Sequence, residues 1–233
     1  MTMSDHGWFE ATFKAPCDLS EINPTREWIT KLLLQNPDLT GWPFFVDLWN
    51  PRHPDWKPYI RDGIWECRIE GQPQDDIGID YWRIDGKAGL FFVARAIEDD
   101  TSPRSPDPGN TLEFSLAIVR TAEILTIASH FSDYLCDSRC DAAESVQVNL
   151  RWNNLQGRQL SNRAERSRYL SLDYTSHSPE VKEVVKVPLN ATKDQISLCT
   201  QKAVSNLFLQ FDGWECPANV IDDLVIKFLS RKW

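Results

Sequence analysis

The sequence predicts an α+β fold, in which a mainly antiparallel sheet packs against a long central helix and C-terminal helices. Strand-like and helical segments are mixed along the chain, as in α+β proteins. Asp85-Gly86 lies between two strand-like runs and predicts a hairpin with a type I′ turn. Residues 111–135 carry the longest helical pattern of the chain, directly after a strand-like start.

Residues 111–135 are expected to organise the domain. Leu112, Phe114 and Leu116 point to one side of residues 111–118, as in a half-buried strand. From Ile118 onward, apolar side chains recur at helical spacing and form a wide face with few charges. Such a helix has to be covered on most sides, so we place it at the centre, against the sheet.

The first half of the chain is predicted to contain one helix and most of the strands. Asn23 and Pro24 suit the N-cap and the first position of a helix that ends at Asn36-Pro37. The prolines of residues 50–62 exclude regular structure there. The predicted strands are residues 8–14, 40–49, 64–69 and the two arms of the hairpin 77–97, with loops at 71–76 and 98–110.

The second half is predicted to finish the sheet and to add two helices. Residues 145–152 alternate as a strand, and residues 169–189 suggest two more strands separated by 175–180. Thr192 suits the N-cap of a helix that runs to about Phe211. A last helix is expected at about 219–229.

Length and composition suit one domain. The 233 residues, 42% of them hydrophobic, suffice for a sizeable core. We expect a disordered start at residues 1–7 and a single α+β domain at 8–233. No signal-peptide pattern and no run of roughly 18 apolar residues occurs, so we expect a cytoplasmic protein without membrane contact and with reduced thiols.

No pattern predicts a metal or a cofactor. Cys136 and Cys140 lack the second pair of ligands that a zinc site needs. Asp76, Asp85 and Lys87 follow the order of a metal-dependent nuclease motif, but the hairpin turn explains Asp85 better.

Nucleophilic and phosphate-binding motifs are missing as well. Neither a GxSxG elbow nor a P-loop occurs. Ser129-His130 falls on the buried helix, and His53 and His177 fall in loops without an obvious nucleophile or orienting acid. We therefore predict no catalytic residues, and a non-enzymatic role is favoured over an enzymatic one.

Residues 151–168 form a concentration of positive charge in a chain of net charge −9. Their only acid is Glu165, and Trp152 adds an aromatic face. Arginine forks beside an aromatic ring suit phosphates, nucleotides or acidic protein segments. In the alternative, this is a solvated loop whose arginines pair with acids such as Asp99 and Asp100. The arginines are Arg151, Arg158, Arg163, Arg166 and Arg168.

Tryptophans are the second candidate contact surface. Trp56 lies in the proline-rich segment and is expected to be the most exposed tryptophan of the first third of the chain. An exposed tryptophan can anchor an interface.

Four segments resemble a known family. The sequence is similar to the C-terminal region of bacterial proteins that carry an N-terminal Schlafen/AlbA-type DNA-binding domain. The matching positions include Trp152, Gly157 and Arg158, and the pair Trp82 and Arg83. The segments are TGWPFFVDLW (40–49), DYWRID…GLFFVARAIEDD (80–100), LEFSLAIVRTAEIL (112–125) and LRWNNLQGRQL (150–160).

The resemblance implies an accessory module. The N-terminal domain, which would carry nucleic-acid or ATP chemistry in that family, has no counterpart in this sequence, so that activity is not carried over. What the resemblance implies is a sensing, scaffold or partner-binding part of a bacterial regulatory or defence system.

Three hypotheses follow. The first is a non-enzymatic module that binds a partner protein or a small anionic ligand, through Arg158 and Trp152 supported by Arg151 and Arg163. The second is nucleic-acid recognition through the same loop. The net charge of −9 disfavours this for the chain alone, although a local basic patch is compatible with that charge. The third is a hydrolase or nuclease with an unrecognised site. A homo-oligomer is compatible with each of the three hypotheses.

Overall fold

The fold is built on a seven-stranded sheet with the strand order β2-β3-β4-β5-β1-β7-β9, in which every pairing is antiparallel. The computed structural model describes residues 7–37, 39, 44–46, 56–70, 79–97, 109–136, 144–162, 170 and 173–230. The elements are β1 (Trp8–Lys14), α1 (Arg26–Leu33), β2 (Tyr59–Arg61), β3 (Ile64–Glu70), β4 (Ile79–Asp85), β5 (Leu90–Ala96), β6 (Thr111–Glu113), α2 (Phe114–Cys136), β7 (Ser145–Asn153), β8 (Gln159–Ser161), β9 (Glu180–Pro188), α3 (Lys193–Leu209) and α4 (Ala218–Leu229).

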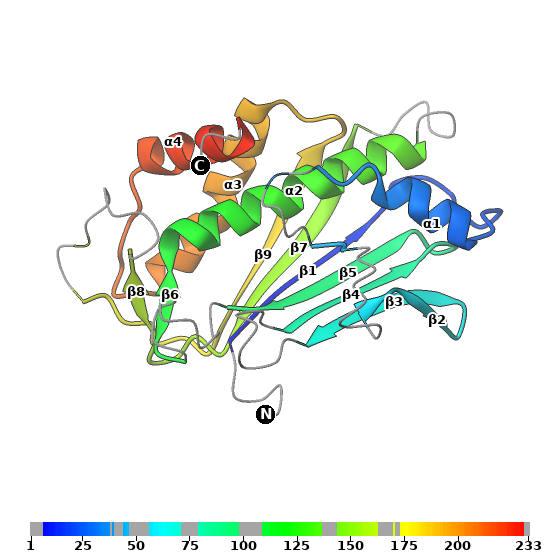
Figure 1. Ribbon diagram of the computed structural model, residues 1–233. Helices are drawn as coiled ribbons and strands as arrows, with labels where there is room; N and C mark the ends of the chain where they lie inside the picture. The colour runs from blue at the N-terminus through cyan, green and yellow to red at the C-terminus, as the bar shows by residue number, and fades with distance from the viewer. Residues whose placement is uncertain are drawn as a thin grey trace.

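The four helices lie on one face of the sheet, which we call the inner face (Figure 1). β1 lies between β5 and β7 and joins the β2–β5 meander to the β7–β9 pair. Ala11, for example, is opposite both Val93 and Leu150. The described residues form one compact domain, and the predicted α+β class is confirmed.

α2 is the core helix. Its residues Ile118, Ile124 and Phe131 are fully buried. Phe131 contacts the rings of Phe45 and Phe91, with centroids 5.4 and 5.8 Å apart. α2 is long and apolar enough to cross a membrane, yet 83% of the relevant stretch is buried inside the domain. These are the properties of a core helix, and α2 occupies the position of a core helix in this domain.

α2 begins at Phe114, four residues earlier than predicted, and β6 is only three residues long. The alternation of residues 112–116 was misleading because Phe114 and Ile118 also fit helical spacing. Glu113 decides in favour of the helix: its buried carboxylate lies at the helix N-terminus and accepts a hydrogen bond from the Ser115 hydroxyl at 2.7 Å. β6 pairs in parallel with β8, outside the main sheet.

Two predicted boundaries are wrong because side chains cap the backbone differently. Thr25, not Asn23, is the N-cap of α1, and its hydroxyl accepts from the Trp28 N–H. The β4–β5 connection is a four-residue loop rather than a two-residue type I′ turn. Asp85 Oδ1 accepts the N–H groups of Lys87 and Ala88 there.

Three further segments differ from the prediction. Residues 59–61 form the edge strand β2 despite the neighbouring prolines, because they pair with β3. Among residues 170 and 173–189, which the structure describes, only β9 is a strand, and Thr175 and Ser176 make isolated bridges. Of the predicted strand 40–49, residues 44–46 are buried and not a strand, while 40–43 and 47–49 lie outside the described residues.

The remaining C-terminal predictions are confirmed, and the start of the chain is only partly described. β7, α3 and α4 lie within two residues of the expected bounds. Residues 1–6 of the predicted disordered start lie outside the described residues. Gly7 already belongs to the fold, since its carbonyl accepts from the Ile97 N–H at 2.8 Å.

We expect Thr192→Ala to lower the free energy of unfolding by about 1 kcal/mol. Thr192 Oγ1 accepts from the Gln195 N–H, and the Gln195 side chain accepts from the Thr192 N–H, which completes a capping box. Urea unfolding measures the change. Ser205→Ala, at an exposed position of the same helix, is the control and should change stability by less. An equal loss in both variants would contradict this role for the cap.

Candidate functional site

The predicted recognition surface of Arg158 and Trp152 is not formed, because both side chains are only 1% exposed. Arg158 donates from Nε to the Asn154 carbonyl at 2.7 Å and from Nη1 to the Thr111 carbonyl at 2.9 Å. Asn154 and Gly157 adopt positive φ values of 57° and 81° in the connection that leads from β7 to β8. Arg158 therefore ties this connection to β6, and the expectation of an exposed arginine fork is wrong.

Trp82 and Trp56 are buried as well, at 1% and 5% exposure. The Trp82 indole N–H donates to the Val46 carbonyl at 3.1 Å. The Trp56 carbonyl accepts from the Cys67 thiol at 3.0 Å. The expectation that Trp56 is exposed is wrong, because its ring joins the hydrophobic core. Both tryptophans stabilise the fold rather than an interface.

Arg83 and Arg151 are exposed, on the face of the sheet opposite the helices, which we call the outer face. Arg163 lies outside the described residues, as do Arg166, Arg168, Asp99 and Asp100. Arg151 and Arg158 therefore do not share one surface. The structure divides the predicted site residues between the interior and the outer face.

A pocket opens on the inner side, where the start of α2 meets the ends of β1, β5 and β7. It is small and partly open to solvent: a water-sized sphere can occupy about 20 Å³ of it, and all open space among its lining residues, solvent included, amounts to about 350 Å³. Much of its wall is apolar, and Phe9 and Trp152 contribute aromatic rings whose centroids are 5.4 Å apart. Trp152 thus belongs to a candidate site, but as a buried residue of the pocket wall and not as an exposed contact residue. The other apolar contributors include Leu112, Leu116 and Ile97.

Arg95 supplies one positive charge to this pocket. It is opposite Asp80 in the β4–β5 register, and both side chains are buried on the inner face. Arg95 Nε donates to Asp80 Oδ1 at 2.6 Å and Nη2 donates to Oδ2 at 3.0 Å, a bidentate pair. Burial and next the charge of Arg120 lower the pKa of the Arg95 guanidinium, while Asp80 and Glu123 act in the opposite direction.

Arg120 supplies the second charge, from the first turns of α2. Its Nη1 is 3.2 Å from Glu123 Oε2, and its side chain is 24% exposed. The guanidinium carbons of Arg95 and Arg120 lie 4.3 and 5.8 Å from the centroid of the Phe44 ring. Two guanidinium groups therefore converge on one ring, and each also pairs with a carboxylate. Glu113 adds a buried carboxylate to the same wall.

This arrangement suits binding better than catalysis. Guanidinium groups stay protonated at neutral pH, so Arg95 and Arg120 can hold an anion but cannot act as general acids or bases. Asp80 is engaged in a bidentate pair. The pocket can take an anionic group at the guanidinium side and an apolar group against Phe9 and Trp152.

Sequence reasoning did not identify Asp80, Arg95 and Arg120 as site residues. Arg95 interrupts an apolar strand, and Arg120 interrupts an apolar helix face, so each was a signal of a buried or half-buried charge. Only the tertiary structure shows that the two charges lie side by side.

The alternative catalytic constellations give no assembled site. Ser129 is buried and links α2 to the chain between β9 and α3, donating to the Pro188 carbonyl and accepting from the Ala191 N–H. His177 does have an acid partner, contrary to expectation: Nε2 is 2.9 Å from Asp212 Oδ1 at the surface. Among the described residues, no three His, Cys, Asp or Glu side chains are grouped for a metal ion, and Asp76 and Cys140 lie outside them.

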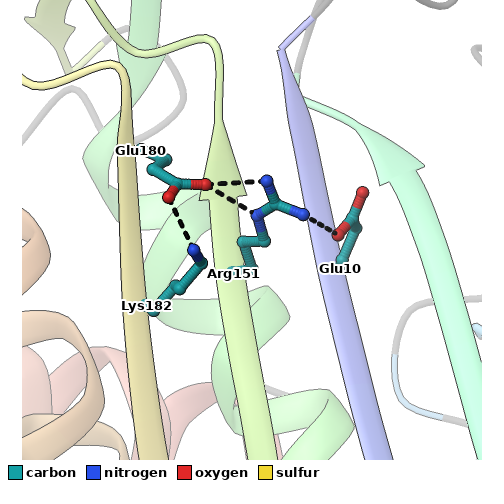
Figure 2. Close-up of polar contacts among 4 residues, drawn as sticks. All are labelled: Glu10, Arg151, Glu180 and Lys182. Carbon is teal, nitrogen blue, oxygen red and sulfur yellow. Dashed lines mark hydrogen bonds and ion pairs between the residues drawn. The ribbon is translucent and has the colours of Figure 1, made fainter.

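The outer face carries ion pairs. Figure 2 shows Arg151 between two acids, with Nη2 2.7 Å from Glu180 Oε2 and Nη1 3.6 Å from Glu10 Oε2. Lys182 Nζ is 2.6 Å from Glu180 Oε1. Arg151 and Lys182 are register partners on β7 and β9, so the strand pairing places them side by side.

A second outer-face cluster surrounds Glu66, whose side chain is fully buried. Its carboxylate oxygens lie 2.6 Å from Arg61 Nη2 and 2.8 Å from Arg83 Nε, although these contacts lack hydrogen-bond geometry. Burial and the charge of Glu66 raise the pKa of Tyr81 to about 12, while Arg83 acts in the opposite direction.

Comparisons of the chain with family models, with curated proteins and with solved structures gave no match. The similarity to the Schlafen/AlbA-associated region remains a prediction from the motifs quoted above.

We expect Arg158→Ala to lower the free energy of unfolding by about 3 kcal/mol, because it removes a buried side chain together with its hydrogen bonds to the Asn154 and Thr111 carbonyls. Arg151→Ala, which removes a half-exposed arginine of β7 seven residues before Arg158, should cost less than about 1 kcal/mol. Urea unfolding followed by circular dichroism compares them. Equal stability of Arg158→Ala and the unmodified chain would contradict the buried position of Arg158.

We expect Tyr81 of the folded protein to ionise at about pH 12, above the ordinary pKa of 10.0 for tyrosine. Because the pKa of Tyr81 is raised above its unfolded value, its contribution to stability is present below about pH 10 and is lost as the pH rises through about 12. Phenolate absorbance measures the ionisation. Glu66→Gln should lower this pKa, and Tyr81→Phe should remove the step. An unchanged titration in Tyr81→Phe would assign the step to another tyrosine and contradict the prediction.

Proposed function

We propose that this chain is a non-enzymatic sensing module that binds a small organic anion in the pocket at the start of α2. The observation that carries the proposal is the convergence of Arg95 and Arg120 on Phe44, beside an apolar wall that includes Trp152. Charged groups in such a pocket are costly to desolvate, so a binding role gives a reason for placing two of them together.

The closeness of two guanidinium groups supports an anion. The charge of Arg120 is unfavourable for Arg95, and an anionic group between them would offset this repulsion. A unit charge about 4 Å from a guanidinium gains about 4 kcal/mol at an effective dielectric constant of 20, before desolvation. Asp80 and Glu123 pair with the two guanidinium groups, and Glu113 lies in the same wall, so a singly charged group such as a carboxylate fits better than a multiply charged phosphate.

Shape and polarity suggest the rest of the ligand. Phe9, Trp152 and Leu112 offer apolar surface on which a flat or branched hydrocarbon group can pack. The proposed ligand class is therefore a small carboxylic acid with an aromatic or branched apolar group. The proposed setting is the cytoplasm of a bacterium, in a regulatory or defence system, where ligand binding would be passed to a partner protein; the resemblance described above is its support.

Calorimetric titration with benzoate, indole-3-acetate and isovalerate tests the proposal. At least one acid should bind, and Arg120→Gln should weaken its binding about tenfold or more, the loss expected for a charge-assisted hydrogen bond. Arg151→Gln removes an equal charge from the outer face and is the matched control, with unchanged affinity. Circular dichroism checks that each variant is folded.

Two outcomes would overturn the proposal: binding of none of the three acids, or binding that Arg120→Gln leaves unchanged. Native mass spectrometry of gently purified protein adds an independent readout, since a retained small acid would add its mass to the chain.

A further inference from the structure

The outer face of the sheet carries more basic than acidic side chains, although the whole chain has a net charge of −9. The strand register assigns seven basic and four acidic described side chains to this face. The basic residues are Lys14, Arg61, Arg68, Arg83, Arg151, Lys182 and Lys186, and the acidic residues are Glu10, Glu66, Asp85 and Glu180. The remainder of the chain is correspondingly more acidic.

Two of these four acidic side chains interact with other groups of the protein. Glu66 is fully buried beside Arg61 and Arg83. Asp85 Oδ1 accepts two N–H groups of the β4–β5 loop. Among the described charged side chains of the β2–β5 part of this face, arginine therefore predominates at the surface, with the Arg61 and Arg83 side chains 62% and 44% exposed.

Glu66 holds the two guanidinium groups in place. It contacts Arg83 through Nε and Arg61 through Nη2, while the Arg83 and Arg61 side chains remain 44% and 62% exposed to solvent and hence accessible to a ligand. Arginine presents such N–H groups in a planar fork that matches phosphate oxygens. Two arginines that share one buried carboxylate form a pre-organised pair of anion contacts.

Aromatic rings lie between these arginines. Tyr59, Arg83 and Phe92 lie in one register row across β2, β4 and β5, with Glu66 between Tyr59 and Arg83. Tyr81 is on the same face, and its ring centroid is 6.0 Å from that of Phe92. Tyr59 is 38% exposed, and Tyr81 and Phe92 are half-buried. Figure 1 shows no labelled helix over this side of the sheet.

We propose that the β2–β5 part of the outer face binds single-stranded nucleic acid. Arginine forks would take the phosphates, and bases would stack on Tyr59 and on the Tyr81–Phe92 pair, as on other single-strand platforms. An acidic peptide would use the arginines but gain little from the rings. Double-stranded nucleic acid hides the faces of its bases. The combination of charge and rings therefore favours single strands.

The net charge of −9 does not oppose the binding of nucleic acid at the outer face. The Debye length is about 8 Å at physiological ionic strength, so exposed acids that lie farther than this from the outer face, on the helical side, are largely screened from it. The inference is independent of the pocket, since the pocket opens on the inner side of the sheet and shares none of these residues.

Fluorescence anisotropy with labelled oligothymidylate and oligouridylate tests the inference. Binding is expected to weaken as salt is raised. The double variant Arg61→Gln/Arg83→Gln should weaken it about tenfold or more, and the slope of log K against log [salt] should become less steep by about 1.4, which corresponds to two lost phosphate contacts. Tyr59→Ala should weaken binding at least about fivefold, as expected for one lost stacking contact.

The matched control is Lys202→Gln/Lys227→Gln, which removes the same charge from α3 and α4. It should leave both the affinity and the salt slope unchanged. Thermal unfolding of every variant confirms that it is folded, and Tyr59→Phe should restore the stacking contact that Tyr59→Ala removes.

Three results would overturn the inference. These are no binding of either oligonucleotide, equal binding of a duplex or of polyglutamate, and an affinity that Tyr59→Ala leaves unchanged. Preference for polyglutamate would identify the face as a site for acidic protein segments instead.

Discussion

The packing of α2 against the inner face of the sheet is the interaction on which the rest of the structure depends. Fully burying one large apolar side chain contributes about 1.5–3 kcal/mol, and α2 buries many, among them Ile118, Ile124 and Phe131. α3 and α4 complete the cover on the same side. Because this apolar surface is collected on one face, the other face of the sheet carries many polar and charged side chains, with aromatic rings such as Tyr59 and Phe92 among them.

This difference between the two faces explains why some charged side chains are paired in the interior and others are exposed to water. On the inner side, a charge is surrounded by apolar groups and has to be paired, as Arg95 is with Asp80. On the outer side, arginines such as Arg83 keep contact with water and can meet a partner. The same residue type is therefore an interior paired charge or a water-exposed one, two roles decided by the face of the strand on which it lies. A shift of one residue in register would exchange these roles.

The start of α2 is the point at which the structure and the proposed function meet. Glu113 provides the negative charge that the helix N-terminus favours, and Arg120 follows two turns later. Arg158 holds the β7–β8 connection against β6 and so fixes the strand from which α2 begins. A ligand between Arg95 and Arg120 would contact both the sheet and the helix, and could thereby change how firmly one is held against the other.

The sequence by itself determined the elements with a strong period or cap: the α+β class, β7 with its strict alternation, α3 with its capping box, and the burial of α2. It did not determine whether Arg158 and Trp152 face solvent, because local charge density carries no information on which way a turn directs a side chain. Positive φ at Asn154 and Gly157 turns Arg158 inward. Likewise, Arg95 and Arg120 are far apart in the chain, and only the packing of α2 on the sheet brings their charges together. Contacts between distant segments depend on the complete fold, and the tertiary structure alone decided both candidate sites.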